Sequence, residues 1–409
     1  MLVTCMYGIM FIILGNISGN AVAFGIYVGI AAGRDPLNGV NGDYSKGMVI
    51  GLAIMTLTLC AAIHIFSRRG GVLLNNIFAV IKVSMVLVLA ILGFVHAGGK
   101  YLQASGINES IPHAIDESPY STINDTLINT AKQINFDKSF ATNRHDVASY
   151  VDSFLFVLFS YTGFEQPFYV LSEVRRPRKY FPPAVLTGMF LATVLYVLVN
   201  VSYLCVVPKG VYTENPANSL NMAGAFLHYL FDNSDGSNTA ERVMAALIAV
   251  SIFGNVIVMT FTAARVKQEI AKEGILPYSL FFATGHTTPL AWLKSSLSRN
   301  PHPRHSQLAT AVNLDDHLEK SPMAALALHW VTSIILVLVT IPLKPSTQYS
   351  FLTALYSYVN LNVVGMLVSG GLLYLKIESF FKGDKGRDWN NKVSCKFAYP
   401  YHQFHCTRY

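Results

Sequence analysis

The stretch that decides the fold is residues 148–183, ASYVDSFLFVLFSYTGFEQPFYVLSEVRRPRKYFPP. Its apolar part is long enough to cross a bilayer, but Thr162, Gly163, Glu165 and Pro167 interrupt the middle. Glycine and proline loosen the helical hydrogen-bond ladder, and a carboxylate at mid-membrane depth is costly unless it faces water, protein or a ligand. Freed backbone groups in a broken helix can hold a polar solute. The sequence therefore predicts a broken transmembrane helix beside a binding site.

A basic cluster follows the broken segment, formed by Arg175, Arg176, Arg178 and Lys179. Short loops rich in lysine and arginine stay on the cytoplasmic side of a membrane. The cluster therefore predicts that the end of the broken helix after Pro167 faces the cytoplasm.

The composition is that of an integral membrane protein. Apolar residues make up 52% of the chain and charged residues 13%, whereas soluble domains contain about 25% charged residues. The net charge of +7 comes from basic loops between apolar segments, so the positive-inside rule explains it without a nucleic-acid partner. The five cysteines show neither metal-ligand spacing nor a disulfide framework. We expect no metal and no cofactor.

Hydropathy predicts an all-α multi-pass protein with about eight spans of about 20 residues each. The spans are expected at residues 5–31, 47–67, 72–96, 148–171, 184–207, 241–264, 323–342 and 350–375. The transmembrane domain then covers 1–376, the loop 97–147 is extracellular, and both the loop 265–322 and the tail 377–409 are cytoplasmic. Sequons at Asn108 and Asn124 in the loop 97–147 agree with this orientation and predict glycosylation there.

Two motifs resemble those of the amino acid–polyamine–organocation superfamily. Residues 159–165, FSYTGFE, are similar to the sixth-helix motif of that family, and residues 172–182, SEVRRPRKYFP, are similar to the linker that follows it. Within the superfamily the likeness is greatest to fungal high-affinity methionine permeases, near the L-type amino acid transporters. The resemblance implies a partial inverted-repeat transporter fold with a broken helix at the substrate site. It also implies that Phe159, Thr162, Gly163, Phe164 and Glu165 contact the substrate.

Two ionisable residues inside the spans have more than one explanation. A lysine in the fifth helix of proton-coupled relatives occupies a cation site, which implies that Lys82 takes part in coupling; its side chain could instead extend to the membrane surface. Burial would make Glu165 a coupling or substrate-contacting acid, whereas wetting by the break or an ion pair would make it structural. Phe159 and Phe164 either gate the pocket or pack.

Polar and small residues in other spans are candidates for the permeation pathway. Asn16 and Asn20 share one face of the first span, where glycines at small-xxx-small spacing also allow tight helix packing. Ser251 and Gly254 lie in the middle of the span 241–264. That span continues into Arg265–Pro277, which resembles the turn after the family's eighth helix.

The resemblance implies transport of amino acids, neutral ones and in particular methionine, by alternating access with proton symport in the plasma membrane. The resemblance does not decide whether the protein needs an accessory subunit. The family plan has twelve helices, and this chain maps onto the third to the tenth, so a nutrient sensor or an inactive partial permease is the alternative. An enzyme is not expected, because His64, His96 and His329 have no acid partners at helical spacing.

Overall fold

The computed structural model describes residues 11–12, 17–34, 46–97, 147–163, 166–174, 176–207, 222–231, 239–297, 320–358 and 365–382. Nearly all of its regular structure is helical. The elements are α2 (Ser18–Ala31), α3 (Lys46–Phe66), α4 (Arg68–Ala97), α7 (Val147–Ser160), η1 (Gln166–Glu173), α8 (Pro177–Val206), α11 (Met222–Phe231), α12 (Thr239–Lys272), α13 (Ser279–Ala283), β1 (His286–Thr287), α14 (Pro289–Leu297), β2 (Lys320–Ser321), α15 (Met323–Val339), α16 (Pro345–Tyr356) and α17 (Gly365–Lys382).

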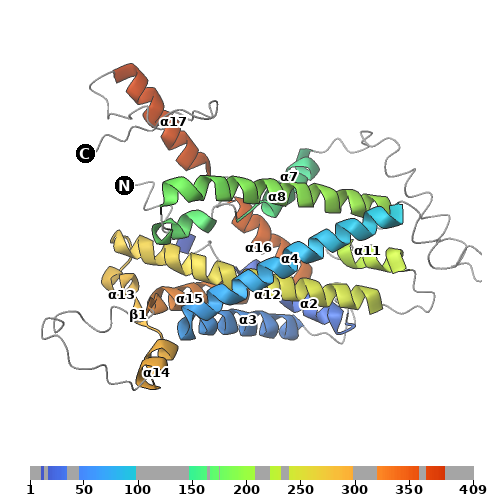
Figure 1. Ribbon diagram of the computed structural model, residues 1–409, viewed down its shortest axis with the longest axis horizontal. Coiled ribbons are helices and arrows are strands. Elements are labelled where there is room, and N and C mark those ends of the chain that lie inside the picture. The colour runs from blue at the N-terminus through green and yellow to red at the C-terminus, as the bar shows by residue number, and fades with distance from the viewer. Residues whose placement is uncertain are drawn as a thin grey trace, which may run out of the picture.

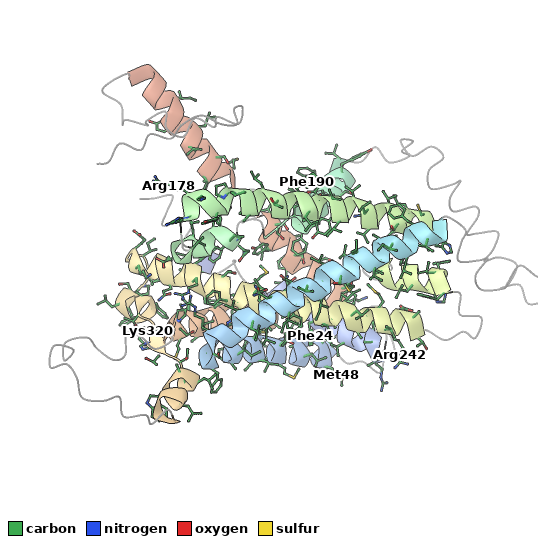
Figure 2. All side chains as sticks on the ribbon, viewed as in Figure 1. Phe24, Met48, Arg178, Phe190, Arg242 and Lys320 are labelled. Atoms are coloured by element: carbon green, nitrogen blue, oxygen red, sulfur yellow. The ribbon has the colours of Figure 1, made fainter. Side chains whose placement is uncertain are left out.

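The long helix α12 lies at the centre of the bundle and packs against α2, α3, α4, α11 and α15 (Figure 1). The helix α4 crosses the bundle obliquely and packs against α8, while α17 extends away from the other helices (Figure 1). The start of α8 and the segment from α13 to α14 lie at the same end of the bundle (Figure 1). Arg178 and Lys320 mark that end, and Arg242 lies at the opposite end (Figure 2).

Within the described residues, α3, the segment Gly70–His96 of α4, α8 and α12 are long and apolar enough to cross a membrane. Large apolar side chains are exposed on the outer faces of α4, α7 and α8, for example Leu73, Val80, Phe154 and Phe190. In water such a surface would be costly, but lipid tails cover it without penalty. The expectation of an all-α multi-pass membrane fold is confirmed.

Most of the expected spans correspond to helices, with three differences. The helix α12 continues past residue 264 to Lys272 and ends before Gly274, whose φ of 74° suits a residue without a side chain. The expected span 350–375 consists of two helices, α16 and α17, on either side of residues that the structure does not describe. A short helix, α11, lies inside the loop 208–240, where none was expected.

The largest apolar core joins α2, α3, α12, α15 and α16. Glycines of α2 allow the close approach that the first span predicted: a side chain at Gly25 would begin 2.6 Å from the carbonyl oxygen of Val49 on α3. On the other side, Gly19 faces Leu352 of α16 at 3.4 Å. Small residues at such contacts let membrane helices pack by van der Waals attraction over their whole length.

A buried polar contact also joins α12 to α15. The ammonium group of Lys267, which is fully buried, lies 3.2 Å from Nδ1 of His329 and donates a 2.9 Å hydrogen bond to Oγ1 of Thr332. These bonds stabilise a charge that would otherwise be costly to bury.

Candidate functional site

A cavity of about 770 Å³ lies in the middle of the bundle. Six helices and the helix break surround it. The lining residues come from α2 and the residue before that helix (Ile17, Gly19 and Asn20), from α4 (Asn75, Lys82, Met85 and Val86), from the end of α7 and the break (Phe159, Ser160, Thr162, Gly163, Gln166 and Pro167), from α8 (Tyr196), from α12 (Ser251, Ile252, Asn255, Val258, Met259 and Thr262) and from α16 (Leu352, Thr353 and Tyr356). Largely apolar walls with a few polar groups are typical of small-molecule sites.

The helix that contains the deciding stretch is broken, as the sequence predicts. The helix α7 ends at Ser160, a turn covers residues 161–163, and the chain resumes as the 3₁₀-helix η1 at Gln166. Gly163 has a φ of 104°, a conformation that residues with a side chain rarely adopt. The backbone of the break pairs in short turns instead: the N–H of Thr162 donates to the carbonyl of Phe159, and that of Gln166 donates to the carbonyl of Gly163.

Side chains of the break fix its first turn. The hydroxyl of Ser160 donates to the carbonyl of Val157 at 2.7 Å, and that of Thr162 donates to the carbonyl of Phe159 at 2.7 Å. These bonds satisfy carbonyls at the end of α7, which has no further helical turn to do so. Phe159, Thr162 and Gly163 therefore line the cavity in a defined local geometry.

A second cavity of about 380 Å³ lies between the break and α8. Ser160, Thr162, Gly163, Pro167 and Tyr196 line both cavities. The broken segment therefore lies between two cavities.

Lys82 of α4 lies at the wall of the central cavity. Its side chain is half-buried and makes no hydrogen bond or ion pair within the part of the chain that the structure describes. Among the described residues that line the cavity, Lys82 alone is charged. An ammonium group in this position favours a ligand with a negative group and disfavours one with a positive side chain.

One face of α12 supplies most of the polar wall. Ser251, Asn255 and Thr262 recur at helical spacing and all line the cavity. The Thr262 hydroxyl donates a short hydrogen bond to Oε1 of Gln166. This bond connects the central helix to the segment after the break.

Asn20 lines the cavity from α2, and its amide nitrogen lies 3.5 Å from the sulfur of Met259 on α12. Gly254 lies elsewhere: it is buried, and a side chain there would begin 2.6 Å from Cβ of Phe78 on α4. The structure thus places Gly254 at a helix–helix contact and not among the cavity residues.

Other predicted site residues lie outside the described part of the chain. These are Phe164 and Glu165 at the break, Asn16 in the first span, and the sequons at Asn108 and Asn124. Within the described residues no group of three histidine, cysteine, aspartate or glutamate side chains could hold a metal ion.

A family model described as amino acid permease matches residues 1–400. The chain belongs to the amino acid permease family. This family consists of transporters, which agrees with the expectation that the protein is not an enzyme, and it confirms the resemblance found in the motifs.

Three relatives show how far the similarity of this permease extends. The high-affinity methionine permease of Saccharomyces cerevisiae is 24% identical over 393 residues, covering 96% of this chain and 54% of the yeast protein. The low-affinity methionine permease of the same organism is 24% identical over 281 residues, covering 68% and 44% of the two chains. The human b(0,+)-type amino acid transporter 1 is 26% identical over 223 residues, covering 54% and 37%. This permease spans about half the length of the yeast relatives that it matches.

Several residues that line the cavity were not predicted from the sequence. Asn75 lies about two helical turns before Lys82 on the same face of α4, so helical spacing could have found it. Asn255 lies four residues after Ser251 and could have been found in the same way. Tyr196 and Thr353 give no such signal, because their place at the cavity depends on contacts between distant helices.

Proposed function

We propose that the central cavity is the binding site for a neutral amino acid, with methionine as the leading candidate, and that the chain moves this substrate across the plasma membrane. The observation that supports this most strongly is the helix break, whose residues Phe159, Thr162 and Gly163 line a cavity of about 770 Å³. Half-helices that point backbone dipoles at a central solute are the usual way in which transporters hold zwitterions. Methionine is favoured by the names of two relatives.

The lining residues suit a zwitterion with an apolar side chain. Lys82 and the amides of Asn75 and Asn255 can receive the carboxylate or its neighbouring groups. Met85, Val86, Ile252 and Val258 provide apolar surface for an aliphatic or thioether side chain. A second positive charge beside Lys82 would be repelled, so cationic amino acids should compete poorly.

The break also supports alternating access. In this mechanism α7 and η1 tilt separately about the turn at Gly163, opening the cavity first to one side and then to the other. Phe159, at the end of α7, is positioned to close the cavity as an aromatic gate. Proton symport would use Lys82, together with Glu165 as predicted from the sequence.

Uptake of radiolabelled methionine tests the proposal. The full chain is produced in cells that lack their own methionine uptake, and its amount at the surface is measured in parallel. We expect saturable uptake that neutral amino acids reduce, that lysine and arginine do not reduce, and that a more acidic exterior increases. A chain that reaches the surface and transports none of these amino acids would refute the proposal and favour a sensor or an inactive partial permease.

A further inference from the structure

The connection between α12 and α15 exposes large apolar side chains beyond the end of a spanning helix. Tyr278 is 86% exposed and Leu280 is 82% exposed, and Phe281 beside them is also exposed. In α14, Trp292 is 64% exposed, and Leu290 and Leu293 are exposed as well. An apolar surface of this kind marks a contact with protein or membrane, because water would make it unfavourable.

The segment is held against the bundle on its other side. Gly274 and Pro277 end α12, and the side-chain amide of Gln268 on α12 donates a 2.9 Å hydrogen bond to the carbonyl of Ala283. The strands β1 and β2 pair antiparallel, and the hydroxyl of Ser321 donates to the carbonyl of His64 on α3 at 3.0 Å. These contacts fix the segment at one end of the bundle (Figure 1). The apolar side chains named above remain exposed.

The exposed face of α14 continues a surface that already faces lipid. The helix α14 packs against α3. On α3, Met48, Met55, Leu59 and Phe66 are exposed at helical spacing, and Phe66 is the last residue of that helix. The helices α3 and α14 are thus in contact, and each presents exposed apolar side chains.

The charge of the segment fits one kind of surface. Residues 278–297 contain one charged residue, Lys294, and neither aspartate nor glutamate. The segment therefore has no carboxylate that an anionic lipid surface would repel. A tryptophan beside leucines on a short helix is typical of side chains that insert at the boundary between headgroups and acyl chains.

We infer that the segment Tyr278–Leu297 lies on the cytoplasmic surface of the bilayer, with Trp292, Leu290 and Leu293 inserted at headgroup level. The lipid surface is the partner that covers these side chains. The segment connects α12 to α15, and it thereby anchors the inner ends of both helices to the plane of the membrane. This inference does not depend on transport, and its test requires none.

Fluorescence of Trp292 tests the inference directly. The chain contains three tryptophans, so the double substitution Trp330→Phe and Trp389→Phe leaves Trp292 as the single emitter in the full chain. The protein is reconstituted in anionic bilayers whose lipids have bromine atoms either near the headgroups or deep in the acyl chains. We expect the strongest quenching of Trp292 from the shallow bromines and weak quenching from aqueous acrylamide.

A matched emitter provides the comparison. The variant Trp292→Phe with Trp389→Phe leaves Trp330, which lies in the span α15 and donates a 3.0 Å hydrogen bond to Thr58 of α3. Deep bromines should quench Trp330 more than they quench Trp292. The inference is overturned if acrylamide quenches Trp292 as strongly as a free indole, or if deep bromines quench it as they quench Trp330.

Discussion

The hydroxyl of Thr262 on α12 donates a hydrogen bond to the side-chain carbonyl of Gln166, the first residue of η1. This bond joins the central helix α12 to the segment that follows the break. Thr262 also lies within 3.3 Å of the carbonyls of Val258 and Met259 on its own helix. The contact therefore connects the cavity wall to the break, and its loss should be measurable in transport.

Replacing Thr262 with valine tests this connection. Valine keeps the shape of threonine and removes the donor, so the variant should fold and lose about 1 kcal/mol, or about fivefold in uptake rate. Thr260→Val is the matched control, because the Thr260 hydroxyl is buried in the same helix and donates to Val256 of that helix. Equal uptake by both variants would show that the Thr262–Gln166 bond has no part in transport.

Gly163→Ala should impair transport through the backbone. The φ of 104° at Gly163 is unfavourable for alanine by about 1–3 kcal/mol. Uptake should therefore fall at unchanged surface abundance. Gly51→Ala on α3 is the control, since a side chain there meets nothing within 4 Å and its helical backbone accepts alanine. If Gly163→Ala transports like Gly51→Ala, the turn is not a required hinge.

Gly254→Ala should destabilise the fold. The new methyl group would begin 2.6 Å from Cβ of Phe78, and overpacking of this kind costs about 1–3 kcal/mol. Gly51→Ala in α3 meets nothing within 4 Å and should keep or slightly raise stability. Thermal unfolding followed by size-exclusion chromatography in detergent compares the two. A stable Gly254→Ala variant with altered uptake would instead place residue 254 on the pathway.

Lys82→Met tests the proposed coupling. Methionine fills similar space and removes the charge, so uptake into proteoliposomes should no longer respond to an imposed pH gradient. Lys179→Met, at the exposed start of α8, should respond like the unsubstituted chain. Gradient-driven uptake by Lys82→Met would refute a coupling role for this lysine.

The helical fold and the break could be predicted from local sequence. Gly163 and Pro167 within an apolar run predict an interruption, because both residues weaken the helix whatever surrounds them. The sequence predicted one span over 350–375, whereas the structure describes α16 and α17 on either side of residues 359–364, which it does not describe. Hydropathy measures whether a segment tolerates lipid, and it says little about where a helix bends.

The cavity could be predicted only in part. Lys82, Asn20 and Ser251 were found because polar groups in apolar spans are conspicuous, whereas Tyr196 and Thr353 reach the cavity through the packing of helices distant in sequence. Gly254 is a small residue in the middle of a span, which made it a candidate for the pathway, yet it packs against Phe78. The contact of Lys267 with His329 joins residues 62 positions apart, and no periodicity in a single sequence reports such a pair.

Equilibrium binding of radiolabelled methionine to the purified full chain tests the central claim most directly, because it requires the cavity and not the complete transport cycle. If the central cavity is the substrate site, we expect saturable binding that Ser251→Trp abolishes by filling the cavity. Ser84→Trp, on the exposed side of α4, should retain it. Absence of saturable binding by the folded chain, or binding that Ser251→Trp leaves unchanged, would contradict a substrate site in the central cavity.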